Sequence, residues 1–494
     1  MAILKKRLFR LIFTHIMGAW MSSDTAPSTS SGVSYPDHPP RITKEDLFMV
    51  LALWMEHFPV EVNENLTKDN RNAKRHHKVG AVLVSSNDIL RAVDCSRGDV
   101  HAVARLLINH PDIAKGSKVF VSRKPCSFCT KLLVQSKVER VFFPPFEPEY
   151  HGVSTSETFE HETSQVDTLF TRSSIGQSVF VPKVEEAVLK CESIDDDDDD
   201  DEKRRIKEEE LFKKFWKEEW MKTVKTKLPW QAFDKKMEDQ VKKYFKTTVK
   251  WMVQTSGLDV EEVSFEKAEG SSLDRDNGET LDFKTAVHLI RMARFLAART
   301  DDPKKGVGAI IVNKNMEIKG LGWNGFPFKA LYGEFPRASD DDVKVKDKKY
   351  PFIIHAEQNA LLMRNAKKLG KDATLFVTKT PCDECAPLIQ MQGIKTVVLG
   401  EKMKSNKSGD LTYVKFPKSV KEGDFTCFET KPPITLPSLS NTSQTKGFKD
   451  LYYSKCEGKV NEEVVTSSEK KSLSRSLPLP SSCYFHCCCG FCYY

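Results

Sequence analysis

Two sets of side chains of the types that bind zinc recur along the chain, each made of one histidine followed by a Cys-x-x-Cys pair. They are His101 with Cys126 and Cys129, and His355 with Cys382 and Cys385. Three protein ligands leave one tetrahedral position open, as in a catalytic zinc site, whereas structural zinc normally takes four. No fourth ligand is evident within either motif, so we predict Zn²⁺ as the cofactor in a catalytic arrangement.

A carboxylate accompanies only the second set. Glu357 lies two residues after His355, whereas Val103 occupies the matching position after His101. A catalytic zinc lowers the pKa of a bound water from 15.7 toward about 7, and a nearby carboxylate can take up a proton and return it. We therefore predict Glu357 as the catalytic acid and base of one working site. Val103 cannot move protons, so the first set is expected to be inactive, its zinc stabilising the fold or its pocket binding a regulatory nucleotide.

The elements that must position these residues alternate between helix and strand. An amphipathic helical pattern begins near residue 44 after a capping Thr43, and short β-rich runs cover residues 79–84, 118–122 and 141–143. Further helices are expected to start near His101 and Cys126, and the order repeats from a helix over residues 283–299. Helix starts favour thiolates through their backbone N–H groups. This alternation predicts a mixed α/β protein with two similar domains.

Composition divides the chain into five expected parts. They are a disordered leader (1–40), a first domain (41–150), a charged linker with amphipathic helices (151–278), a second domain (279–430) and a disordered tail (431–494). The linker contains seven consecutive aspartates, Asp195–Asp201, which we expect to form a disordered loop because like charges repel. Its aromatic residues, interleaved with lysines, could bind single-stranded nucleic acid. Their three-to-four-residue spacing instead favours helix faces that pack on the two domains.

The net charge and the cysteine pattern set expectations for the partners of the protein and for its cellular compartment. The 494 residues carry 76 basic and 69 acidic side chains, a net charge of +7 that does not by itself require nucleic acid or membrane. The 13 cysteines are not spread like a disulfide framework, which favours a reducing compartment. The first 20 residues have the composition of a transit peptide but lack an A-x-A-like cleavage site. We expect a cytoplasmic and nuclear protein.

The second motif, His-Ala-Glu-Gln-Asn-Ala-Leu at 355–361 with Thr-Pro-Cys-Asp-Glu-Cys at 380–385, resembles the zinc-dependent cytidine and deoxycytidylate deaminases. The Trp-Asn-Gly run at 323–325 and Tyr-Pro-Phe at 350–352 resemble the deoxycytidylate branch. The resemblance covers residues 43–150 and 280–430. It implies tandem three-layer α-β-α domains with a helical, partly disordered insert. It also implies that Asn324 hydrogen-bonds the substrate's sugar, although an Asn-Gly pair equally suits a turn.

The resemblance implies a hydrolase acting on the C–N bond of a cyclic amidine. The expected reaction converts the cytosine of cytidine, deoxycytidine or their nucleotides (dCMP or dCTP) to uracil. Two alternatives remain, a deaminase that edits nucleic acid and a non-catalytic zinc scaffold. A homo-oligomer is also expected by resemblance. From the Val-Gly-Ala glycine to the motif histidine there are 21 residues in the first copy and 47 in the second. A long loop before an active-site helix is more often functional than idle.

Overall fold

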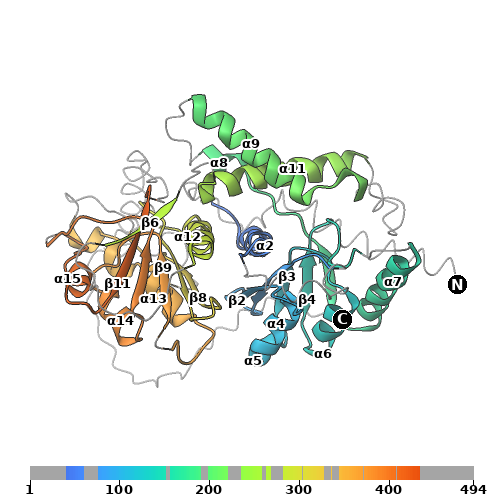
Figure 1. Cartoon of the computed structure of the whole chain (residues 1–494), viewed down its shortest axis with the longest axis horizontal. Coiled ribbons are helices and arrows are strands. Elements are labelled where there is room, and N and C mark those ends of the chain that lie inside the picture. Colours follow the sequence, from blue (N-terminus) through green and yellow to red (C-terminus); the bar gives the residue numbers. More distant parts are fainter. Residues whose placement is uncertain are drawn as a thin grey trace, which may run out of the picture. The chain divides into compact units, whose positions relative to one another are not determined.

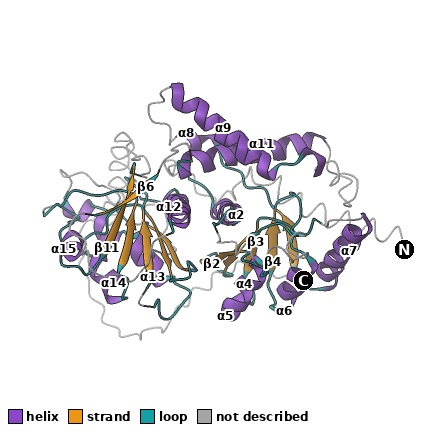
Figure 2. Cartoon of the chain, viewed as in Figure 1, coloured by secondary structure: helices purple, strands orange, loops and turns teal. Residues whose placement is uncertain are grey.

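The computed structural model describes twelve stretches of the chain, and every structural statement below concerns them. They are residues 41–59, 76–151, 156–190, 198–220, 235–258, 263–268, 282–302, 304–327, 335–336, 344–370, 372–407 and 409–433. Two β-sheets, each flanked by helices, are shown in Figure 1 and, by secondary structure, in Figure 2. The expected leader lies outside these residues, as does nearly all of the expected tail, including its cysteine cluster.

The first sheet has five strands in the order β2-β1-β3-β4-β5. The central β1 pairs antiparallel with β2 and β3, and β3, β4 and β5 run parallel. The strands are β1 (Gly80–Val84), β2 (Leu90–Cys95), β3 (Lys118–Val121), β4 (Arg140–Phe143) and β5 (Gly176–Val179). The β-rich runs in the sequence therefore form strands as predicted, and β5 comes from the segment expected to be linker.

The second sheet repeats this plan in the order β6-β11-β10-β9-β7-β8. Its strands are β6 (Ser264–Lys267), β7 (Gly308–Val312), β8 (Ile318–Trp323), β9 (Thr374–Val377), β10 (Thr396–Leu399) and β11 (Thr426–Lys431). Gly80 pairs with Cys95 in the first sheet and Gly308 with Trp323 in the second, and the register shifts after the fourth residue of β1 and of β7. The antiparallel β6 is an additional edge strand. The expected tandem repeat is thus present in the backbone.

Helices cover both faces of each sheet, which confirms the three-layer α-β-α fold. In the first domain, Val82 and Val84 pack in one core with α2 (Lys44–Met55), while Ala81 and Leu83 pack in another with α4 (Ala102–Asn109) and α6 (Ser127–Gln135). Residues two apart on a strand share a face, so this alternation defines the layers. The second domain uses α12 (Phe283–Ala297) on one face, and α13 (Ala356–Leu362) and α14 (Cys385–Met391) on the other.

The remaining helices are short connections or belong to the segment between the domains. They are α5 (Pro111–Ala114), α7 (Ser156–Arg172), α8 (Glu186–Lys190), α9 (Asp198–Phe215), α11 (Lys235–Ser256), η3 (Val345–Asp347), η4 (Tyr350–Phe352) and α15 (Lys415–Lys421). No helix in the described part of the chain is long and apolar enough to span a bilayer.

The glycine of each Val-Gly-Ala run permits close contact between strand and helix. A Cβ atom on Gly80 would lie 2.0 Å from the carbonyl oxygen of Ala52 in α2, and one on Gly308 would lie 1.9 Å from that of Ala293 in α12. Both distances are far below van der Waals contact, so only glycine fits. The motif therefore sets how closely each helix approaches its sheet.

The first helix differs from its expected amphipathic character. Thr43 caps α2 as predicted, with its Oγ1 accepting from the backbone N–H of Asp46 at 3.1 Å. Ten of the twelve residues of α2 are buried, however, because α2 packs on β1 and also contacts α12 of the second domain. A helix buried all round has no polar face.

The segment between the domains is more ordered than expected at its acidic run. Asp198–Asp201 begin α9 rather than lying in a disordered loop, since acidic residues suit the first turn of a helix; Asp195–Asp197 lie outside the described residues. The prediction that the aromatic residues pack on the domains is confirmed for Phe215, Trp216, Phe245 and Trp251, which are buried in the core that contains α2 and α12. Trp230 and Phe233 lie outside the described residues.

Candidate active site

Two helix starts bring the second set of zinc-binding side chains together. His355 is the N-cap residue of α13, and Cys385 begins α14 just after Cys382. His355 Nδ1 lies 3.2 Å from the sulfur of Cys382 and 3.3 Å from that of Cys385. These three groups form one cluster able to hold a metal ion, with no fourth His, Cys, Asp or Glu ligand among the described residues.

The protonation of this cluster suits a soft cation. A hydrogen bond with Cys385 and the imidazole of His355 lower the pKa of Cys382 to about 4, although burial opposes the shift. The hydrogen bond with Cys382 and burial raise the pKa of Cys385 far above its usual value. One sulfur is thus ready as a thiolate, and the other releases its proton when a metal ion binds. Two thiolates and one imidazole are a donor set that zinc favours, so the residues fit the cofactor.

Glu357 lies in the first turn of α13, beside the cluster. Its side chain is buried, and it forms a hydrogen bond with Cys385. Burial raises the pKa of Glu357 to about 7, while the nearby His355 partly opposes this shift. A carboxyl group whose pKa lies near neutrality can both accept and donate a proton under physiological conditions.

The cluster opens into a cavity of about 590 Å³. His355, Glu357 and Cys382 line this cavity together with Asn324 and Tyr350. Its volume lies in the range of small-molecule sites. Four lysines also line it, namely Lys304, Lys305, Lys349 and Lys379.

Two of these lysines are held by carboxylates. Lys349 is buried and pairs with Asp302, while Lys305 pairs with Glu401. The ammonium of Lys379 instead lies over the ring of Tyr413, 5.2 Å from its centroid, and makes no ion pair with any described residue. A buried lysine is rare unless it is paired, as Lys349 is, and Lys379 is the lining lysine that keeps its charge without an ion pair among the described residues.

Asn324 lines the cavity, but its amide is already bonded within the chain. Its Oδ1 accepts from Val307 N–H at 2.7 Å, and its Nδ2 donates to the carbonyl of Lys305 at 2.9 Å and to Asp302 Oδ2 at 3.2 Å. These bonds hold the loop that carries two of the cavity lysines. Contact between Asn324 and a substrate stays a prediction, for which a second lone pair on Oδ1 is suited.

The first set of zinc-binding residues also comes together. His101 Nδ1 lies 3.4 Å from the sulfur of Cys126 and 3.3 Å from that of Cys129, and Cys126 is the N-cap residue of α6. Val103 is buried in the core of the first domain. Each half therefore has its own cluster of one histidine and two cysteines. The halves differ two residues after the histidine, where the second has Glu357 and the first has Val103.

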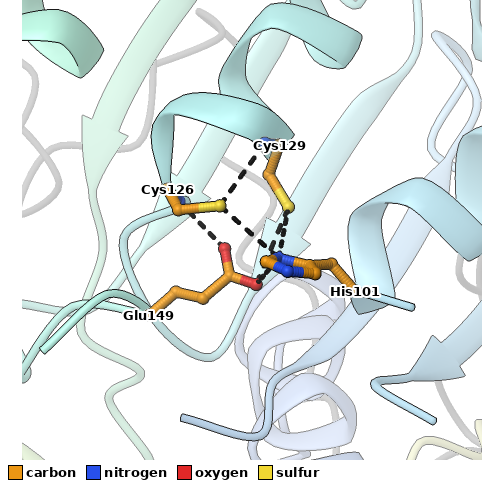
Figure 3. Close-up of side chains that lie close together, drawn as sticks. All are labelled: His101, Cys126, Cys129 and Glu149. Carbon is orange, nitrogen blue, oxygen red and sulfur yellow. Dashed lines mark hydrogen bonds and ion pairs between the residues drawn. The ribbon is translucent and has the colours of Figure 1, made fainter. Parts of the chain in front are cut away.

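The first cluster contains a fourth residue that was not predicted from the sequence. Glu149, in the loop after β4, reaches His101, Cys126 and Cys129, as Figure 3 shows. It lies 20 residues after Cys129, outside any local motif. The only signal was the pair of acidic residues, Glu147 and Glu149, in a proline-rich, otherwise apolar run. His76 also lies close to this cluster, with its ring centroid 4.7 Å from that of His101.

Comparison with known proteins agrees with this geometry. The profile of the cytidine and deoxycytidylate deaminase zinc-binding region matches residues 56–144 and again residues 284–401. The zebrafish (Danio rerio) cytidine and dCMP deaminase domain-containing protein 1 is 27% identical over 423 residues, covering 77% of this chain and 88% of the relative. Human deoxycytidylate deaminase is 38% identical over 111 residues, which are 22% of this chain and 61% of that enzyme.

A solved structure is also similar, the dCMP deaminase of cyanophage S-TIM5 in complex with dCMP and dUMP. It is 22% identical, its TM-score is 0.24, and the match covers 30% of this chain and 99% of that one. The chain belongs to the zinc-dependent cytidine and deoxycytidylate deaminase family. It carries two copies of the family's zinc-binding region, and its cofactor is zinc.

Proposed function

We propose that the second domain hydrolyses the amino group from the cytosine of a phosphate-bearing nucleotide, giving the uracil nucleotide and ammonia. The observation that carries this proposal is the cavity that joins Glu357 and the three-ligand cluster to four lysines. A cytosine ring at the cluster end would leave its phosphates within the same cavity, where ammonium groups stabilise negative charge.

Each residue has a role in this proposal. His355, Cys382 and Cys385 hold the zinc ion, which when bound supplies a Lewis acid that makes water acidic near neutral pH. Glu357 would accept one proton of the attacking water and deliver it to N3 of the ring. It would then take the second proton from the new C4 hydroxyl and carry it to the amine, which departs as ammonia and leaves the C4 carbonyl. These steps are sequential, so one carboxyl group with a pKa near 7 serves both. Asn324 keeps the loop with Lys304 and Lys305 beside the cavity.

The lysines support a nucleotide over a nucleoside. A free nucleoside offers no negative charge, so its site would gain nothing from clustered cations, which repel one another. Lys379 lines the cavity without a carboxylate partner among the described residues, so its ammonium is available to a phosphate. The names of the relatives, deoxycytidylate deaminases, are consistent with this substrate class.

Substrate comparison tests the proposal. Zinc-loaded full-length protein is incubated with cytidine, deoxycytidine, dCMP and dCTP, and in parallel with single-stranded DNA and RNA. We expect uracil product from dCMP or dCTP at a higher kcat/KM than from either nucleoside. Product from the polymers alone would replace this proposal with nucleic-acid editing. A zinc-loaded protein that acts on none of them would be a scaffold.

Two single-lysine variants test the phosphate contact. Lys379→Ala is expected to raise KM for the nucleotide with little change for deoxycytidine, because only the former carries phosphate. The control is Lys395→Ala, an exposed lysine of the same domain outside the cavity. Equal effects of Lys379→Ala on nucleotide and nucleoside would contradict the phosphate contact.

Two further properties belong to the same proposal. We place the protein in the cytoplasm and nucleus, to be tested by imaging the tagged full chain, with an organelle pattern contradicting it.

We also propose that it self-associates. The exposed Leu362 and Met391 lie at the ends of α13 and α14, which contact each other, and such apolar residues favour a protein partner. Sedimentation should show an oligomer that Leu362→Glu weakens, and a monomer at micromolar concentration would contradict this part.

A further inference from the structure

The carboxylate of Glu149 lies against all three zinc-binding residues of the first domain (Figure 3). Its Oε1 is 2.7 Å from His101 Nδ1 and 3.7 Å from the sulfur of Cys129. Its Oε2 accepts a hydrogen bond from the backbone N–H of Cys126 at 2.9 Å. Glu149 is 1% exposed, so this carboxylate is shielded from water by the protein.

Backbone hydrogen bonds fix the position of this side chain. The N–H of Glu149 donates to the carbonyl of Lys124 at 3.0 Å, and its own carbonyl accepts from His77 N–H at 2.7 Å. The residue is therefore tied to the strand end just before Cys126 and to the segment before β1. With Oε2 bonded to Cys126 N–H, Oε1 is the oxygen directed at the cluster.

The four donor atoms have nearly the spacing of a tetrahedral site. Zinc bonds of about 2.0–2.3 Å at tetrahedral angles separate neighbouring ligand atoms by about 3.3–3.8 Å. The two nitrogen–sulfur distances, 3.4 and 3.3 Å, and the sulfur–oxygen distance of 3.7 Å fall in this range. The 2.7 Å between His101 and Glu149 is a hydrogen-bond length, and these two groups need to separate by at least about 0.6 Å to share a metal ion.

Among its described residues, the second domain has no carboxylate that joins its cluster in this way. There, Glu401 in the loop after β10 lies beside the segment before Cys382, its carbonyl accepting from Thr380 N–H at 3.1 Å, and its side chain pairs with Lys305. The second cluster therefore keeps three ligands among the described residues. The two domains thus place a buried glutamate near the cluster from different elements, the loop after β4 in the first and the first turn of α13 in the second.

The cavity beside the first cluster also differs in charge. Of the cluster residues only Cys126 lines it. Its border carries three acidic side chains on α7 (Glu160, Glu162 and Asp167) and two basic ones, Lys124 and Arg172, of which Lys124 pairs with Asp167. Glu162 accepts hydrogen bonds from the N–H and hydroxyl of Ser127 at the start of α6. One lysine thus lines this cavity, whereas four line the cavity of the second domain.

We propose that Glu149 is the fourth zinc ligand of the first domain, so that its zinc site is closed and structural. A closed site has no position for water, and four protein ligands are the arrangement of zinc sites that stabilise a fold. The first domain is then inert for two separate reasons, the absence of a proton carrier at Val103 and the occupied fourth position.

Metal spectroscopy on the first site alone tests this proposal. The double variant Cys382→Ser/Cys385→Ser of the full chain removes the second site, so that one equivalent of Co²⁺ reports on the first. We expect an absorption spectrum of four-coordinate cobalt that does not change on addition of azide, because an anion binds only at an open position. A shift on azide addition in this protein would by itself overturn the closed site.

A matched pair of variants identifies the ligand. In the same background, Glu149→Gln should make the cobalt spectrum sensitive to azide and speed transfer of zinc to a chelator by at least about tenfold. Glu147→Gln is the control, since Glu147 lies in the same loop but pairs with His77 Nε2 at 3.1 Å. A Glu149→Gln spectrum identical to that of Glu147→Gln would overturn the assignment. These readouts require no turnover, so they stay independent of the proposed deamination.

Discussion

The indole of Trp54 in α2 donates a hydrogen bond of 3.1 Å to the backbone carbonyl of His288 in α12. The two rings also stack, with centroids 4.8 Å apart. Trp54 belongs to the first domain and lies in the core that contains α2, α12 and the aromatic residues of α9 and α11, and His288 of the second domain is buried against it. The two copies are therefore joined through buried contacts.

Trp54→Phe should destabilise the whole chain. It removes the indole N–H and leaves space beside His288, which together cost about 1–3 kcal/mol in the free energy of unfolding. Urea unfolding followed by circular dichroism measures this change. Ile108→Ala, at an exposed position of α4, serves as the control and should have little effect. Equal stability of both variants would contradict the importance of this contact.

Gly308→Ala should also destabilise the protein, by about 1–3 kcal/mol or more. The new Cβ would overlap the carbonyl oxygen of Ala293, which cannot move without displacing α12. Gly176→Ala is the matched control, because its nearest neighbour is the Arg140 side chain at 3.1 Å, and an arginine side chain can shift. Thermal unfolding of the two variants should separate them, and similar melting temperatures would speak against the steric argument.

Glu357→Gln should lower kcat by a factor of about 10²–10⁴ while zinc content is retained. Glutamine has nearly the same shape but cannot carry a proton, and Glu357 is outside the three-ligand cluster. Turnover is measured with the preferred substrate of the parent protein, and zinc by atomic absorption. Near-normal rates would show that another group carries the proton. Loss of zinc would show that Glu357 supports the metal.

Val103→Glu should not create activity in the first domain. If Glu149 fills the fourth position, a restored carboxylate finds no water to act on. In the Glu357→Gln background, which silences the second domain, Val103→Glu should give no product above that background alone. Product formation there would argue against a closed first site.

The two histidines of the shared core should make stability fall in acid. Burial lowers the pKa of His57 to about 3 and that of His288 well below its usual value, so both are neutral in the folded protein. In the unfolded chain they take up protons near pH 6.5. Stability is therefore complete above pH 6.5 and decreases as the pH falls toward 3, by up to about 1.4 kcal/mol per pH unit for each histidine.

His288→Phe tests this prediction, since it keeps an aromatic ring on Trp54 without a titrating group. The difference in unfolding free energy between parent and variant should change between pH 7 and pH 5 in favour of the variant. His161→Phe, on the exposed side of α7, should show no such change. Parallel pH profiles for all three proteins would contradict the assignment.

Periodicity and motif spacing predicted the elements that position the site. The strands at residues 79–84 and 118–122, the helix starts near His101 and Cys126, and the duplicated plan all follow from local patterns. These patterns suffice because alternation and capping act over a few residues. The convergence of each histidine with its cysteine pair has the same origin, since both lie at helix starts on one side of a sheet.

Glu149 and the burial of α2 could not be predicted in this way. Glu149 reaches Cys129 only because the loop after β4 folds back along the segment before Cys126. This contact joins residues that are far apart in the sequence. The helix α2 appears amphipathic when considered alone, and the second domain covers its other side. Both features depend on the packing of complete domains.

The buried packing of α2, α11 and α12 against one another has a consequence for the evolution of the gene. A gene that lost its N-terminal half would encode a protein with Trp251, Phe295 and their neighbours facing water, and such a protein would aggregate. Selection that maintains the fold of the second domain would therefore also maintain the first, whether or not the first domain has an activity of its own.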